Sequence, residues 1–118
     1  MDYPDLFDDD GYPTDDALNR LEHWLPVQGE THTAINAALD YARALWSDYG
    51  TVSEDLQPAE RALLHAEATE RFLRFATGGW SGNESVIAAL NANCLLCTFT
   101  WRLNAAGGLH IYRYLNPV

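Results

Sequence analysis

The sequence predicts an α+β fold, with about four helices followed by a C-terminal β-hairpin or small antiparallel sheet packed on them. Apolar residues recur at the helical period of about 3.6 from Thr14 to Leu90, and the period changes to two after Asn93. A chain of 118 residues is most simply one domain. We therefore expect an acidic N-terminal arm over residues 1–13 and a single globular domain over residues 14–118.

The first two helices have recognisable ends. Thr14 is a suitable N-cap, and the leucines that follow it recur at helical spacing until Pro26 ends the helix. The second helix has the clearest apolar stripe, from Thr31 to Tyr49, and Gly50 suits the position just after its end.

The third and fourth helices are predicted on either side of a glycine pair. Pro58 suits the first turn of a helix that we expect to continue to Ala76, where Gly78 and Gly79 stop it. In the stretch "GGWSGNES", Ser81 followed by Glu84 matches a capping box, which predicts that the fourth helix starts at Ser81 behind a buried Trp80.

The C-terminal third predicts two strands. Residues 94–103 alternate between an apolar and a mixed face, "NAAGG" forms a turn, and residues 109–114 alternate again. A free edge of this hairpin predicts pairing with a second copy of the chain. Cys94 and Cys97 would lie on opposite faces of the first strand, so we expect two buried thiols rather than a redox pair or a metal site.

The charge is high and uneven. Of the formal charge of −10, residues 1–30 contribute −8, from nine acids and Arg20, and the rest contribute −2, from eight acids and six arginines. Such a surface repels nucleic acid and anionic lipid. The absence of lysine excludes Schiff-base, P-loop and protein-kinase chemistry. No leader or membrane-spanning run is recognised, so we expect a cytoplasmic protein.

The acidic arm is the first candidate binding surface. Its aspartates and aromatic residues could engage a basic protein partner and, if that partner binds nucleic acid, stand in for phosphates. The predicted contacts are Asp8, Asp9, Asp10, Asp15, Asp16, Tyr3 and Phe7. A calcium loop is not expected, because Leu6 and Ala17 occupy the two anchoring ligand positions. We expect no metal and no cofactor.

The glycine-rich corner is the alternative site. If the hairpin packs beside it, a small ligand would meet Trp80, Ser81, Asn83, Glu84, Trp101, His110 and Tyr112. No nucleophile–base pair and no GxSxG or HExxH motif is present, so we expect binding rather than catalysis.

The C-terminal third also resembles a pattern in short bacterial and phage proteins. In that pattern a GGWSxNE helix start is followed by a tryptophan strand and a GGH turn into an aromatic strand. The matching residues are Gly78, Gly79, Trp80, Ser81, Asn83, Glu84, Trp101, Gly107, Gly108 and His110, with Leu109 as an insertion. The resemblance carries no activity with it and implies a phage or prophage context, in which small inhibitors are common.

The leading hypothesis is therefore a non-catalytic, acidic protein-binding protein, such as a phage-encoded inhibitor of a host or rival protein. A small-ligand module or enzyme at the Gly78–Ser85 corner is the second hypothesis, and a structural subunit that assembles through the hairpin is the third.

Overall fold

A computed structural model describes residues 6–25 and 31–115. Over these residues the chain forms five helices and one four-stranded antiparallel sheet, which confirms the predicted α+β class. The helices are α1 (Asp15–Glu22), α2 (Thr31–Ala44), α3 (Pro58–Leu63), α4 (Ser81–Ala92) and α5 (Cys94–Thr100). The strands are β1 (Thr51–Ser53), β2 (Phe72–Ala76), β3 (Trp101–Ala105) and β4 (Leu109–Arg113), in the spatial order β1-β2-β4-β3.

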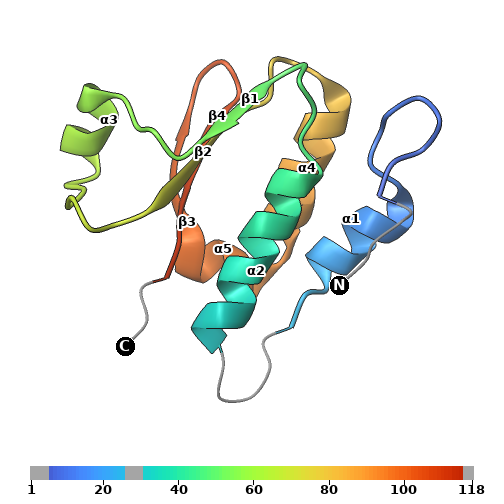
Figure 1. Cartoon of the computed structure of the whole chain (residues 1–118), viewed down its shortest axis with the longest axis horizontal. Helices are drawn as coiled ribbons and strands as arrows, with labels where there is room; N and C mark the ends of the chain where they lie inside the picture. Colours follow the sequence, from blue (N-terminus) through green and yellow to red (C-terminus); the bar gives the residue numbers. More distant parts are fainter. Residues whose placement is uncertain (1–5, 26–30, 116–118) are drawn as a thin grey trace.

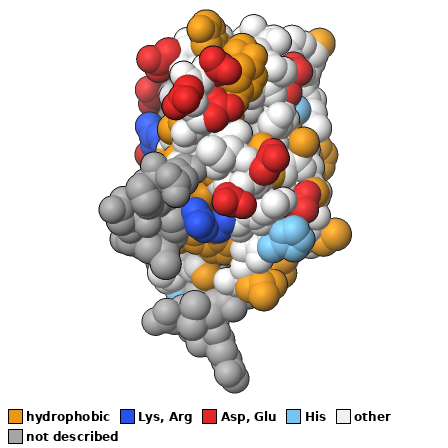
Figure 2. All heavy atoms as spheres, turned by 90° about the vertical axis from the view of Figure 1, so that its right-hand side faces the viewer, with side chains coloured by type: hydrophobic (Ala, Val, Ile, Leu, Met, Phe, Trp, Pro, Cys, Tyr) orange, Lys and Arg blue, Asp and Glu red, His pale blue; other side chains and the backbone are white. Residues whose placement is uncertain are grey.

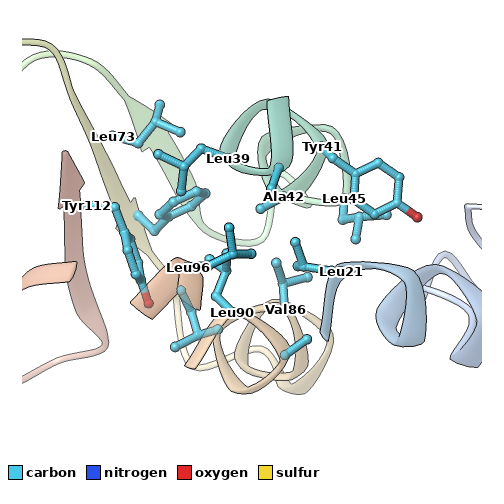
Figure 3. Packing of buried hydrophobic residues seen from close by; sticks show 14 of the residues in the cluster. Leu21, Leu39, Tyr41, Ala42, Leu45, Leu73, Val86, Leu90, Leu96 and Tyr112 are labelled. Atoms are coloured by element: carbon cyan, nitrogen blue, oxygen red, sulfur yellow. The ribbon is translucent and has the colours of Figure 1, made fainter. Parts of the chain in front are cut away.

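The sheet separates the short helix α3 from α1, α2 and α4. Helices α1, α2 and α4 lie on one side of it and α3 lies on the other (Figure 1). The inner face of the sheet presents Leu73, Phe75 and Tyr112 to the helices, and all three are fully buried. Figure 3 shows leucines from α2, α4 and α1 meeting in front of this face. Burial of this continuous apolar cluster is the main source of stability.

The outer face of the sheet is partly ionic. Arg74 on β2 pairs with Glu60 on α3 at 2.9 Å, and Arg113 on β4 pairs with Glu70 at 2.6 Å. These partly buried pairs fix the α3 segment against the sheet, beside the buried side chains of Phe72 and Ile111.

The predicted third helix is wrong beyond its first turns. It ends at Leu63, and His65 adopts a left-handed backbone conformation with φ of 52°, as residues that follow a helix often do. The residues expected to complete it instead form β2, where Leu73 and Phe75 face the core and Phe72 and Arg74 face α3. The two-residue period within "FLRFA" is the signal that the helical interpretation overlooked.

The predicted first strand of the hairpin is also partly wrong. Residues 94–100 form α5, and the strand begins only at Trp101. Asn93 explains the start of the helix, because its Oδ1 accepts the Leu96 N–H at 3.1 Å as an N-cap. The expected buried thiols are likewise corrected, since Cys94 is exposed and Cys97 partly exposed.

The first two helices begin as expected but are shorter. Thr14 Oγ1 accepts the Ala17 N–H at 3.1 Å, which confirms the N-cap, and α1 ends at Glu22. Pro26, the predicted stop, lies outside the described residues. Helix α2 ends at Ala44, and the backbone of Ser47 bonds to the buried side chain of Asn83 instead of continuing the helix.

Candidate functional site

The described part of the acidic arm is a tight loop held by one of its own carboxylates. Asp8 Oδ1 accepts the backbone N–H groups of Asp10 at 2.9 Å and Tyr12 at 3.0 Å. The Asp8 N–H donates to Tyr12 O, and Phe7 bridges Pro13 in an antiparallel pair. Residues 6–14 therefore have a defined conformation, in which Asp9 and Asp10 are exposed. Tyr3, also predicted to contact a partner, lies outside the described residues.

The glycine-rich corner shapes the position of one side chain, Trp80. A Cβ on Gly82 would collide with the indole ring, so only glycine leaves room for Trp80 to lie over the first turn of α4. Gly78 has a φ of +65°, and a Cβ there would collide with the carbonyl oxygen of Tyr49. The corner therefore brings Trp80 and the backbone of Tyr49 close together.

Trp80 joins the acidic loop to the corner. Its ring stacks on Tyr12, with centroids 4.8 Å apart and an interplanar angle of 27°, and lies 5.0 Å from the ring of Tyr49. These aromatic rings are partly open to solvent, with 40% of Tyr12 and 70% of Tyr49 exposed. We call Tyr12, Tyr49 and Trp80, together with Asp8, Asp9 and Asp10, the acidic aromatic patch.

The charge on this face is not balanced by ion pairs within the described residues. The arginine ion pairs among the described residues use Glu54, Glu60 and Glu70, and none of them uses an aspartate of residues 8–16. Figure 2 shows acidic side chains around exposed hydrophobic ones on the upper part of the face that carries the N-terminal loop. Asp15 and Asp16 add exposed charge at the start of α1.

In the alternative ligand site, Asn83 has a structural role, and Ser81 does not have the capping role predicted for it. Asn83 is fully buried, where it accepts the Ser47 N–H at 2.9 Å and donates to the carbonyl oxygens of Ser47 and Thr77. Ser81 is the first residue of α4 rather than its N-cap, a position that Trp80 occupies without a side-chain bond. The predicted capping box of Ser81 and Glu84 is therefore wrong.

Three other residues of the alternative site, Trp101, His110 and Tyr112, lie on the β3–β4 hairpin. Asn104 Oδ1 accepts the indole N–H of Trp101 at 2.9 Å and lies 2.7 Å from His110 Nδ1. An indole nitrogen only donates, so the atom at this position must be the amide oxygen, and His110 Nδ1 must carry a proton. The neutral ring then presents its Nε2 lone pair away from Asn104.

The surroundings of His110 favour this neutral form. Burial lowers the pKa of His110, and the negative charge of Glu84 on α4 opposes the shift without reversing it. Tyr112 is buried and donates its hydroxyl to Asn91 Oδ1 at 2.7 Å, and burial raises its pKa far above neutrality. His110 is thus the available proton acceptor of this cluster, and Tyr112 stays protonated.

The predicted ligand residues therefore fall in two places. Trp80 contacts the acidic loop, whereas Trp101 and His110 lie on the hairpin, and Glu84 on α4 acts electrostatically on His110. The sequence interpretation missed Tyr12 and Tyr49 as partners of Trp80 and missed Asn104 as the residue that orients His110. A signal was available for Asn104 only, because it is polar, alternates with the apolar residues of its strand and faces His110 across the turn.

The hairpin does present the edge strand expected to pair with a second copy. Strand β3 is at the edge of the sheet, where 40% of Trp101 is exposed, and 44% of Phe99 is exposed on the preceding helix α5. Arg102 lies at an irregularity in the β3–β4 register and donates to the carbonyl oxygens of Trp101 and Phe99. Assembly through this edge stays a prediction, and a second copy would have to compete with this arginine.

In residues 6–25 and 31–115, no helix has the length and apolar character required to span a bilayer. The same residues contain no group of three or more His, Cys, Asp or Glu side chains placed to hold a metal ion.

Comparison of the chain with protein-family models, curated proteins and solved structures finds no match, so its function has to be inferred from its own residues.

Proposed function

We propose that this chain is a non-catalytic binding protein whose acidic aromatic patch takes up an arginine-bearing segment of a basic protein partner. The observation that carries this proposal is the partly exposed stack of Tyr12, Trp80 and Tyr49, in which Tyr12 belongs to the loop that carries the exposed Asp9 and Asp10. A guanidinium group stacks on aromatic rings and pairs with carboxylates, so this combination suits arginine better than other side chains.

The charge distribution supports the same kind of partner. The excess of −8 in residues 1–30 attracts a cationic protein and speeds its association. If the natural partner binds nucleic acid, the aspartates of residues 8–16 stand in for phosphates and the chain acts as an inhibitor. We place the chain in the cytoplasm and propose a host or rival protein as its target, in keeping with the phage context that the sequence resemblance implies.

A labelled arginine-rich peptide provides a defined first test. Its affinity would be measured by fluorescence anisotropy for the full chain and for Tyr49→Ala and Asp9→Asn. Tyr49 and Asp9 are exposed, so neither change disturbs the core. Loss of one cation–π contact should weaken binding roughly twofold to thirtyfold, and raising the salt concentration should weaken it further.

Matched controls separate the patch from net charge. Asp55→Asn and Glu67→Gln each remove one exposed charge near α3, on the other side of the sheet, and should leave the affinity unchanged. If these controls weaken binding as much as Asp9→Asn, only the overall charge matters and the proposed patch is wrong. If the controls leave the affinity unchanged, capture from host lysate at low and moderate salt would identify the natural partner.

A small-ligand site at His110 is the second candidate, favoured by the oriented ring and its available Nε2. Fragment screening by NMR should then show shifts at the His110 ring that Asn104→Ala and Glu84→Gln reduce. A screen in which bound fragments never perturb His110 would remove this candidate.

A further inference from the structure

The structure removes the reason for treating Cys94 and Cys97 as an inert pair. In a strand, residues three apart point to opposite faces, but these cysteines lie in the first turn of α5. Residues three apart in a helix are neighbours on one side, with Cβ atoms about 5–6 Å apart. A disulfide needs Cβ atoms about 4 Å apart, so a small local movement brings the two sulfurs together.

That movement is available at Cys94. The first backbone bond of the helix runs from the Cys97 N–H to the Asn93 carbonyl oxygen at 2.9 Å, and the Asn93 side chain caps the Leu96 N–H. The N–H of a first helical residue has no partner within the helix, so a turn of Cys94 toward Cys97 affects at most the one helical bond that its carbonyl oxygen accepts.

Both thiols can also be reached. Cys94 is exposed and Cys97 partly exposed. The hydrogen bond found for Cys97 Sγ among the described residues is a weak one, to Asn91 Oδ1 at 3.9 Å. Breaking it to form a disulfide would cost little free energy.

We propose that Cys94 and Cys97 are a reversible redox site that forms an intramolecular disulfide by exchange with a low-molecular-weight disulfide such as oxidised glutathione. The Cys94 thiolate attacks one glutathione sulfur, which forms a mixed disulfide and releases one glutathione thiolate. The Cys97 thiolate then attacks the Cys94 sulfur and releases the second glutathione. The two cysteines are oxidised, the oxidised glutathione is reduced to two thiols, and two protons leave the cysteines.

Incubation of the folded chain with excess oxidised glutathione, followed by alkylation of the remaining thiols and mass spectrometry, tests this assignment. The wild-type chain should lose two hydrogens and both alkylation sites. Cys97→Ser should keep glutathione on Cys94, and the wild-type chain should carry less than about a tenth of that adduct, because Cys97 resolves it.

Three results would overturn the proposal: a glutathione adduct that persists on the wild-type chain, a disulfide that links two chains, or thiols that stay reduced. Circular dichroism of Cys94→Ser and Cys97→Ser would establish that both variants remain folded. The same titration in urea adds a further check. A native chain that is harder to oxidise than the unfolded chain would show that the fold opposes the bond, which contradicts the proposal.

Discussion

Asn83→Ala should destabilise the protein strongly, although sequence patterns alone suggested a ligand-contacting role for this residue. The side chain is fully buried and makes three hydrogen bonds, to the N–H and carbonyl oxygen of Ser47 and to the carbonyl oxygen of Thr77. It thereby joins the end of α2, the end of β2 and the first turn of α4. Alanine cannot form any of these bonds. The Ser47 N–H then loses its partner, whereas the carbonyl oxygens of Ser47 and Thr77 keep the bonds that they accept from the Gly50 and Trp80 N–H groups.

The expected cost follows from these three bonds. Each contributes about 1 kcal/mol, and the Ser47 N–H left unpaired in a partly buried setting adds to that, so we expect a loss of about 3 kcal/mol or more. For a domain of this size such a loss lowers the melting temperature by roughly 10 °C or more. Urea unfolding of the wild type and Asn83→Ala provides the measurement.

Ser81→Ala is the matched control, two residues away in the same helix. A capping serine would cost about 1 kcal/mol when replaced. In the structure Ser81 is exposed and is not the N-cap, so its replacement should change the free energy of unfolding by less than about 0.5 kcal/mol. A loss below about 1 kcal/mol for Asn83→Ala, or a larger loss for Ser81→Ala, would refute the assigned roles.

Four further outcomes are expected. Asn93→Ala should cost about 2–3 kcal/mol in urea unfolding, because Asn93 caps α5 and donates to the carbonyl oxygens of Leu21 and Trp24; a loss below ~1 kcal/mol would contradict this. His65→Gly should keep the stability within ~0.5 kcal/mol, whereas His65→Val should lose about 1 kcal/mol or more, because φ is positive there; equal thermal midpoints would be the contrary result. The pKa values of Glu60 and Glu70 are both lowered from 4.5. For Glu60, burial raises the pKa, but hydrogen bonds from Arg74 and the Gln57 N–H together outweigh it. For Glu70, hydrogen bonds from the Glu67 N–H and from Arg113 lower the pKa. The two carboxylates therefore contribute their full stabilisation above pH 4.5, and this stabilisation is lost as the pH falls through their pKa values in the folded protein. The double variant Glu60→Gln/Glu70→Gln should consequently lose less stability on acidification than the wild type, measured as urea midpoints. If β3 pairs with a second copy, Arg102→Ala should strengthen self-association in sedimentation experiments, and an unchanged monomer would argue against that edge.

The sequence was most informative where a short pattern reports a local interaction. Thr14 caps α1 as predicted, and the turn before β4 allows the hairpin to form. Interpretation failed in two apolar stretches, residues 72–76 and 94–100, where helical and extended patterns both fit. The choice there depends on contacts distant in sequence: β2 pairs with β1 and β4. Asn93 similarly caps α5 while it bonds to the end of α1.

The candidate sites were harder to predict because their parts come from distant segments. Nothing near Trp80 in the sequence indicates that its ring stacks on Tyr12, 68 positions earlier, since such a contact follows only from the way α1 and α4 pack. Asn83 shows the opposite difficulty. A polar residue in a glycine-rich stretch resembles a ligand contact, and only its burial and its three backbone bonds reveal a structural role.

The stack of Tyr12 on Trp80 also changes how the acidic segment would act. A flexible arm loses conformational entropy when it binds. A loop that is already held by Asp8 and Trp80 loses much less on binding, because it was ordered when the protein folded. The proposed binding surface is therefore preorganised, and Trp80 contributes to it twice, as a face for a guanidinium group and as support for the loop that carries Asp9 and Asp10. Replacing Trp80 should consequently weaken binding more than replacing Tyr49, which is the more exposed of the two and supports no part of the loop directly.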